Sequence, residues 1–176
     1  MAKVLAVDDE AYVLRALQRE LRGHPFDLVT ESDPLVALER LKTESFDVII
    51  SDCRMPGIDG VRLLTEARKR QPQSVRMMLS GHADMQDLLL SINEAGIYRF
   101  IAKPWSMPEL SAAMSEALSQ RRVLLENERA RAIAREAEDQ SLRRALLDDA
   151  LDEWNARDPD ATAVSHAPVR WGGRRE

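Results

Sequence analysis

Short apolar runs alternate with amphipathic segments along the N-terminal part of the chain. Each run is too short for a helix and is rich in β-branched and aliphatic residues, which predicts buried strands coated on both faces. We expect these strands at Lys3–Val7, Phe26–Thr30, Val48–Ser51, Val75–Leu79 and Ile97–Ala102.

The segments between these runs carry apolar residues at helical spacing, with capping residues at their ends. Asp33-Pro34, for example, combines an N-cap with a proline in the first helical position. Alternation of strands and helices predicts βαβ units, so the fold class is α/β, with a doubly wound five-stranded parallel sheet. We expect the helices at Ala11–Arg22, from Asp33-Pro34, from Asp59-Gly60 to Arg70, and at Ala83–Ala95.

A much longer helical pattern follows. It begins at the capping-box sequence Ser106-Met107-Pro108-Glu109, and no Pro or Gly occurs between Glu109 and Arg157. The stretch is dense in strong helix formers, so we expect one long helix, or two with a break, reaching about Trp154. Its apolar spacing thins between residues 126 and 138 and returns from Leu142, so a strict heptad repeat is not sustained.

We therefore divide the chain into a folded α/β domain at residues 1–120, a C-terminal helical extension at 121–154 and a disordered tail at 155–176. The extension is either a linker helix leading to an output domain or a dimerising, signal-transmitting helix. We favour the second interpretation, because an isolated helix of this length is marginal unless its apolar positions pack. The basic end of the tail could bind a partner or nucleic acid, but a solvated tail is the simpler interpretation.

Composition narrows the class of protein. Hydrophobic residues make up 44% of the chain, enough for a core, and the formal net charge of −5 makes nucleic acid an unlikely main partner. Cys53 is the one cysteine in the sequence, which excludes a disulfide framework and fits a cytoplasmic location. No apolar run has the length of a membrane helix, and a strand begins too soon for a signal peptide.

Polar residues that could bind a ligand or take part in a reaction follow four of the predicted strands. Because parallel strands bring their carboxyl ends to one edge of a sheet, these side chains should meet. Three carboxylates suit Mg²⁺, while an amine and a hydroxyl suit a phosphoryl group. Singly, each residue has an ordinary structural explanation, as a cap, a helix-opening acid or a surface lysine. The residues are Asp8 and Asp9, Asp52, Ser80 and Lys103.

Asp52 could be the nucleophile that accepts a phosphoryl group, with a metal ion and Lys103 neutralising the charge as it transfers. At this point the sequence resembles the CheY-like receiver domain of two-component response regulators, over about residues 3 to 120. The resemblance implies the flavodoxin-like strand order 2-1-3-4-5. It is carried by Val7-Asp8-Asp9, Asp52, Met55-Pro56-Gly57, Asp59-Gly60, Ser80-Gly81 and Lys103-Pro104.

The resemblance also implies roles for these residues. Asp52 would be phosphorylated by a sensor histidine kinase. Mg²⁺ would be held directly by Asp9 and Asp52, largely through water by Asp8, and by the backbone carbonyl of Arg54. The phosphoryl oxygens would be contacted by Ser80 and Lys103.

Two further properties follow from the resemblance alone. In the switch, the Ser80 hydroxyl would move toward the phosphoryl group as an aromatic on the last strand, here Phe100, turns inward. The positions that tune phosphoryl lifetime would be Arg54 and His82. Phe100 could equally be an ordinary core or edge aromatic, and His82 a solvated loop histidine.

We thus expect a phosphorylation-controlled signalling protein, without enzymatic activity beyond slow self-dephosphorylation. It would act on a downstream protein partner or output domain, or dimerise through the fifth helix and the extension. A Mg²⁺-dependent phosphatase or phosphotransferase is the alternative, although Arg54 stands where such an enzyme would place a second Asp. A third hypothesis is a receiver that binds partners without phosphorylation, but the complete set of acids argues against it. A receiver fragment of a longer regulator is also compatible with the sequence.

Overall fold

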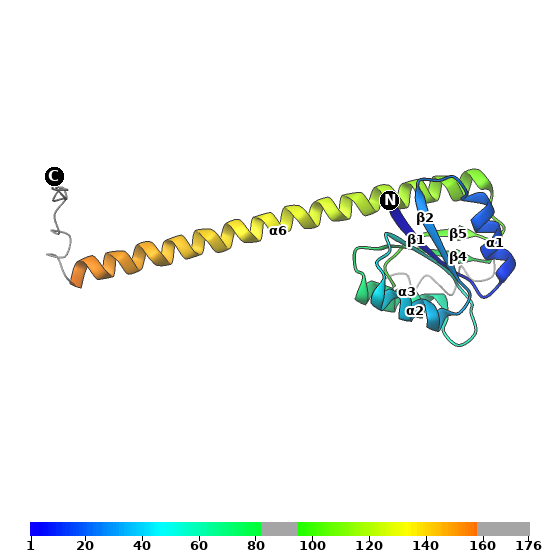
Figure 1. Ribbon diagram of the computed structural model, residues 1–176, viewed down its shortest axis with the longest axis horizontal. Helices are drawn as coiled ribbons and strands as arrows, with labels where there is room; N and C mark the ends of the chain where they lie inside the picture. Colours follow the sequence, from blue (N-terminus) through cyan, green and yellow to red (C-terminus); the bar gives the residue numbers. More distant parts are fainter. Residues whose placement is uncertain (82–94, 158–176) are drawn as a thin grey trace, which may run out of the picture. The chain divides into compact units, whose positions relative to one another are not determined.

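The computed structural model describes residues 1–81 and 95–157. Its five strands form one parallel sheet of order β2-β1-β3-β4-β5, which confirms the doubly wound fold with the flavodoxin-like strand order (Figure 1). The expected fourth helix, at 83–95, lies almost wholly outside the described residues, as do His82 and positions 158–176. The strands are β1 (Ala2–Val7), β2 (Phe26–Glu31), β3 (Val48–Asp52), β4 (Val75–Ser80) and β5 (Ile97–Ala102).

The register of the sheet brings the carboxyl ends of the inner strands to one edge. Asp52 at the end of β3 pairs with Leu79 of β4, and Ser80 pairs with Ala102 of β5. A β-bulge interrupts the start of the β4–β5 pairing, leaving Tyr98 without a partner residue on β4. The bulge lies at the opposite end of these strands, so it leaves the pairing beside the polar residues regular.

Helix boundaries follow the capping residues. Asp33 accepts a hydrogen bond from Leu35 N at 2.8 Å, and Asp59 accepts one from Arg62 N at 2.7 Å. The end of α1 differs from expectation, because the helix expected to reach Arg22 ends at Glu20. The described helices are α1 (Ala11–Glu20), α2 (Pro34–Thr43), α3 (Gly60–Arg70) and α6 (Met107–Arg157).

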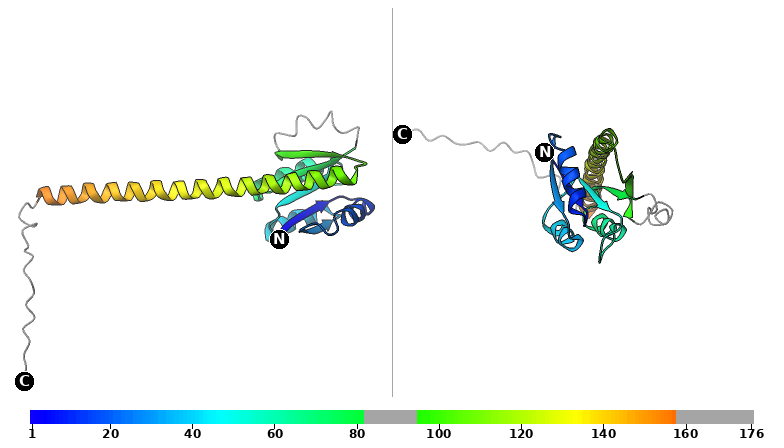
Figure 2. Two further views of the ribbon diagram at one scale, coloured as in Figure 1. Left: turned by 90° about the horizontal axis from the view of Figure 1, so that it is seen from above. Right: turned by 90° about the vertical axis from the view of Figure 1, so that its right-hand side faces the viewer.

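Helices cover both faces of the sheet (Figures 1 and 2), and a separate hydrophobic core lies on each face. On one face, α1 and the first turns of α6 bury side chains such as Leu17 and Leu110. On the other face, α2 and α3 bury side chains such as Leu41 and Leu64, and the Cys53 side chain is buried in the same core. The layers thus hold the strand ends from both sides, and the polar residues at those ends belong to neither apolar core.

The chain divides into two compact units, Met1–Glu128 and Arg129–Glu176. Within the first unit, Arg121 of α6 forms an ion pair with Asp47 at 3.1 Å. Within the second unit, α6 continues past Trp154 to Arg157, so residues 155–157, which we expected in the tail, are helical. The described part of the chain contains no helix that is both long and apolar enough to cross a membrane.

Large apolar side chains of the second unit are exposed to solvent. They include Ile133, Leu142, Leu146, Leu147, Leu151 and Trp154, each between 58% and 67% exposed.

Candidate functional site

Lys103 lies at the centre of the polar edge, directly after β5. Its Nζ atom is 2.6 Å from Asp52 Oδ1 and 2.7 Å from Asp8 Oδ2, and 18% of its side chain is exposed. Burial lowers the pKa of Lys103, but the hydrogen bonds to the two carboxylates outweigh this effect, so the pKa is raised above its ordinary value. The ammonium therefore stays charged and joins two carboxylates that would otherwise repel each other.

Asp8 is the most deeply buried of the predicted site residues, with none of its side chain exposed. Burial raises its pKa above the ordinary value, and hydrogen bonds from Lys103 and from Glu10 N only partly offset this effect. The charged carboxylate is thus held at this position against its own desolvation cost, a common feature of functional sites.

Asp52 presents its carboxylate from the last position of β3. Oδ2 accepts a hydrogen bond from Arg54 N at 2.9 Å, while Oδ1 faces Lys103. Its backbone carbonyl accepts a hydrogen bond from the buried Ser51 hydroxyl at 2.9 Å. Gly60 approaches the same carbonyl so closely that a Cβ at this position would lie 1.9 Å from the oxygen. Only glycine fits there.

Ser80 ends β4 and is almost fully buried. Its backbone carbonyl accepts a hydrogen bond from Lys103 N at 2.8 Å, which ties the ends of β4 and β5 together. Its hydroxyl has no hydrogen-bond partner within residues 1–81 and 95–157. Because a buried hydroxyl without a partner is costly, this group is suited to contact a ligand that arrives at the edge.

Asp9 and Glu10 lie on the outer side of this site. Both residues are exposed, and Glu10 Oε1 approaches Lys103 Nζ to 3.9 Å. In the described residues, no group of three or more His, Cys, Asp or Glu side chains is arranged to hold a metal ion. Lys103 instead occupies the position between Asp8 and Asp52.

Of the five side chains that the sequence predicted as a group, the structure places Asp8 and Asp52 in direct contact with Lys103. Phe100 is half-buried and packs against the core formed with α2 and α3. The sequence did not predict the roles of Ser51 and Gly60 beside Asp52. Ser51 could have been noticed from the sequence, because it is a polar residue in an otherwise apolar strand.

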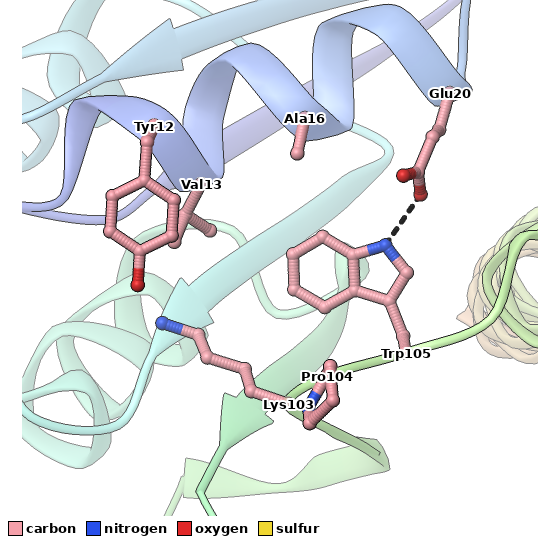
Figure 3. Close-up of a pocket in the computed structure, with 7 residues that line it drawn as sticks. All are labelled: Tyr12, Val13, Ala16, Glu20, Lys103, Pro104 and Trp105. Carbon is pink, nitrogen blue, oxygen red and sulfur yellow. Dashed lines mark hydrogen bonds between the residues drawn. The ribbon is translucent and has the colours of Figure 1, made fainter.

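A cavity of about 410 Å³ lies beside Lys103, between α1 and the loop that follows β5 (Figure 3). Tyr12 on α1 points its hydroxyl toward the Lys103 ammonium. The Trp105 indole Nε1 donates a hydrogen bond of 2.6 Å to Glu20 Oε2, which attaches the loop to the last turn of α1. Sequence reasoning did not predict this contact.

Comparisons with known proteins agree on one family. A family model described as the response regulator receiver domain matches residues 4–115. The hydrogenase transcriptional regulatory protein HoxA of Cupriavidus necator is 41% identical over 117 residues, which cover 66% of this chain and 24% of that protein. The DNA-binding transcriptional regulator NtrC of Escherichia coli is 32% identical, again over 66% of this chain and 24% of that protein.

Among solved structures, the signal receiver domain of an HD domain-containing protein from Pseudomonas fluorescens is 33% identical, with a TM-score of 0.68. The match covers 71% of this chain and 92% of that chain. The chain thus spans about a quarter of the length of the two curated relatives, and nearly all of an isolated domain.

Proposed function

The chain belongs to the response regulator receiver family, and we propose that Asp52 accepts a phosphoryl group from a sensor histidine kinase in a Mg²⁺-dependent reaction in the cytoplasm. One observation carries the proposal: the Asp52 carboxylate lies 2.6 Å from the Lys103 ammonium. A nucleophile for phosphoryl transfer and a fixed positive charge for the transferred oxygens are thus in contact.

The chemistry assigns a role to each side chain. An Asp52 carboxylate oxygen forms a bond to phosphorus as the bond between phosphorus and the donor breaks, and the electron pair leaves with the donor. Lys103 then pairs with a phosphoryl oxygen in place of the Asp52 oxygen. The Ser80 hydroxyl, which has no partner among the described residues, donates a hydrogen bond to another phosphoryl oxygen.

The donor set fits Mg²⁺, which commonly binds proteins through one or two carboxylates and keeps several waters. Asp8 and Asp52 already converge on one positive charge. We assign the ion to Asp52 and Asp9 directly, to Asp8 largely through water, and to the Arg54 carbonyl. When bound, the ion neutralises phosphoryl charge during transfer.

Incubation with acetyl phosphate and Mg²⁺, followed by intact mass measurement, tests the assignment. We expect the mass of one phosphoryl group to be added, and no addition in the presence of EDTA. Asp52→Asn should abolish the addition, whereas Asp59→Asn, which changes only the cap of α3, should retain it. Phosphorylation of Asp52→Asn at the wild-type rate would assign the acceptor to another residue.

We further infer that phosphorylation is transmitted through the fifth strand and α6. Inward movement of the Ser80 hydroxyl shifts the following loop, and Phe100 fills the vacated space. Because α6 begins shortly after Lys103, it responds to both changes. The exposed apolar side chains of the extension support a shift from monomer to dimer on phosphorylation.

The size of the relatives supports a place for this chain within a longer regulator. HoxA and NtrC are transcriptional regulators about four times the length of the matched segment. We propose that the receiver controls an output domain or a downstream protein partner, with the histidine kinase as its phosphoryl source. Self-dephosphorylation, tuned by Arg54 and His82, would reset it.

A further inference from the structure

Ser51 is a buried polar residue directly before the phosphoacceptor Asp52, and the phosphoryl-transfer roles proposed above do not include it. It lies in β3 between Val7 of β1 and Met78 of β4, and none of it is exposed to solvent. Its hydroxyl forms a hydrogen bond in addition to the backbone hydrogen bonds of the sheet. It donates to the Asp52 backbone carbonyl at 2.9 Å, at the point where the chain leaves the sheet.

Gly60 contacts the same carbonyl from the first turn of α3. A Cβ on Gly60 would lie 1.9 Å from the Asp52 carbonyl oxygen and 3.0 Å from Ser51 Oγ. The Gly60 amide also donates to the Cys53 carbonyl at 2.9 Å. The carbonyl of the phosphoacceptor is therefore fixed by a hydroxyl donor and by close contact with a helix.

The peptide that links Asp52 to Cys53 controls the direction of the carboxylate. On its other side, Cys53 N donates to the Leu79 carbonyl at 2.9 Å. The next amide, of Arg54, donates to Asp52 Oδ2 at 2.9 Å. Rotation of the linking peptide would move the Arg54 amide and hence release Oδ2, while Oδ1 would still be drawn toward Lys103.

We propose that Ser51 is a positioning residue for phosphoryl transfer, which acts by holding the Asp52–Cys53 peptide so that the carboxylate faces an incoming phosphoryl donor. This role rests on the proposed phosphorylation of Asp52. In-line transfer is sensitive to misplacement of the nucleophile, and small displacements can lower the rate by one to two orders of magnitude.

Ser51→Thr and Ser51→Val form the matched pair that tests this role. Both add the same volume and both suit a strand, but only threonine retains the donor. The substrate is acetyl phosphate with Mg²⁺, and the phosphorylation rate is followed by intact mass as the donor concentration is varied. Thermal unfolding of each variant measures stability separately. If the larger threonine and valine side chains prevent folding, Ser51→Ala, which removes only the hydroxyl oxygen, is compared with wild type instead.

We expect the valine variant to reach a maximal rate at least about fivefold below that of the threonine variant, with the donor concentration at half-maximal rate unchanged. Equal maximal rates for the two variants, or for Ser51→Ala and wild type, would overturn the positioning role. A purely structural role would lower the unfolding temperature without changing the maximal rate of the folded protein. If wild type itself gains no phosphoryl group, the proposed phosphorylation of Asp52 is wrong. That result differs from equal rates in the variants, which would reject only the positioning role of Ser51.

Discussion

Lys103 and Asp8 lie near opposite ends of the receiver sequence, yet Lys103 Nζ is 2.7 Å from Asp8 Oδ2. The same Nζ contacts Asp52 Oδ1 at 2.6 Å, so one ammonium compensates two carboxylates that approach it from different strands. Lys103 should therefore affect both the stability of the folded protein and the response to phosphorylation, and substitutions can measure the two effects separately.

Replacing Lys103 by Met keeps the apolar stem and removes the charge. Asp8 and Asp52 then repel each other in a buried setting, so we expect the free energy of unfolding in EDTA to fall by about 3 kcal/mol. Urea denaturation measures this loss, and Mg²⁺ should restore more stability to the variant than to wild type.

The switch should also fail in Lys103→Met, even if some phosphorylation persists, because the phosphoryl oxygens lack their cation. Lys69→Met is the control, since Lys69 forms an exposed ion pair with Glu66. Its unfolding free energy should change by less than about 0.5 kcal/mol. Unchanged phosphorylation-dependent dimerisation in Lys103→Met would contradict the role given to Lys103.

Asp8→Asn should stabilise the metal-free protein. Because the folded pKa of Asp8 is raised above 3.8, the folded state binds the proton more tightly than the unfolded state does. The contribution of this group to stability is therefore greatest below pH 3.8 and falls as the pH rises through the folded pKa. We expect the variant to be more stable than wild type by about 1 kcal/mol at about pH 7.

Urea denaturation in EDTA at about pH 7 and about pH 4 measures this effect, and the advantage of Asp8→Asn should shrink at the lower pH. Asp9→Asn, at an exposed position, should show no comparable gain. A variant less stable than wild type at neutral pH would mean that the Lys103 ion pair outweighs the desolvation of Asp8.

Trp105→Phe should loosen the loop that follows Lys103. Phenylalanine keeps most of the ring packing but loses the Nε1 donor to Glu20, so we expect a loss of about 1 kcal/mol in unfolding free energy. The Trp105 fluorescence should also respond to beryllofluoride with Mg²⁺, because the indole follows Lys103 so closely.

At protein concentrations too low for dimerisation, Trp105→Phe should remove that fluorescence response, while Trp154→Phe, in the extension, should retain it. Equal responses in wild type and Trp105→Phe would mean that the loop does not report on the site.

Leu151→Asn should weaken dimerisation through the extension. Leu151 lies on the same side of the helix as Leu147 and Trp154, and all three are exposed. A dimer buries two Leu151 side chains, one from each protomer, and because each is already partly covered the pair contributes about 2 kcal/mol in total. We therefore expect the beryllofluoride-dependent dimer to dissociate at protein concentrations about 30-fold higher than for wild type. Sedimentation measures the shift.

Ala145→Asn on the opposite side of the same helix carries a comparable loss of helix propensity and should dimerise as wild type does. If wild type has the same mass and the same hydrogen exchange from Leu110 to Trp154 with and without beryllofluoride, the extension is a passive linker.

The sequence predicted what depends on local pattern. The β-branched run at Val48–Ser51 and the cap at Asp33 are local signals, and both elements formed as expected. The grouping of Asp8, Asp52 and Lys103 was also predictable, because parallel strands must end at one edge. Their detailed contacts were not, since the sharing of one ammonium by two carboxylates depends on side-chain geometry across three strands.

Contacts without a local signal were missed. The Trp105–Glu20 hydrogen bond joins residues far apart in the sequence, and neither residue type favours that partner. The bulge at Tyr98 depends on how β5 fits against Arg76 and Met77, which strand propensity does not encode. Gly60 was predicted to begin a helix, but its close approach to Asp52 required the packing of α3 against the sheet.

The buried Cys53 thiol can be used to measure local opening of the chain beside the phosphoacceptor. Cys53 is the one cysteine in the sequence and follows Asp52 directly, with 7% of its surface exposed. A thiol-specific reagent can reach it only when the end of β3 opens. The rate of thiol labelling therefore measures local opening at the acceptor itself, in the unmodified chain and without an attached probe.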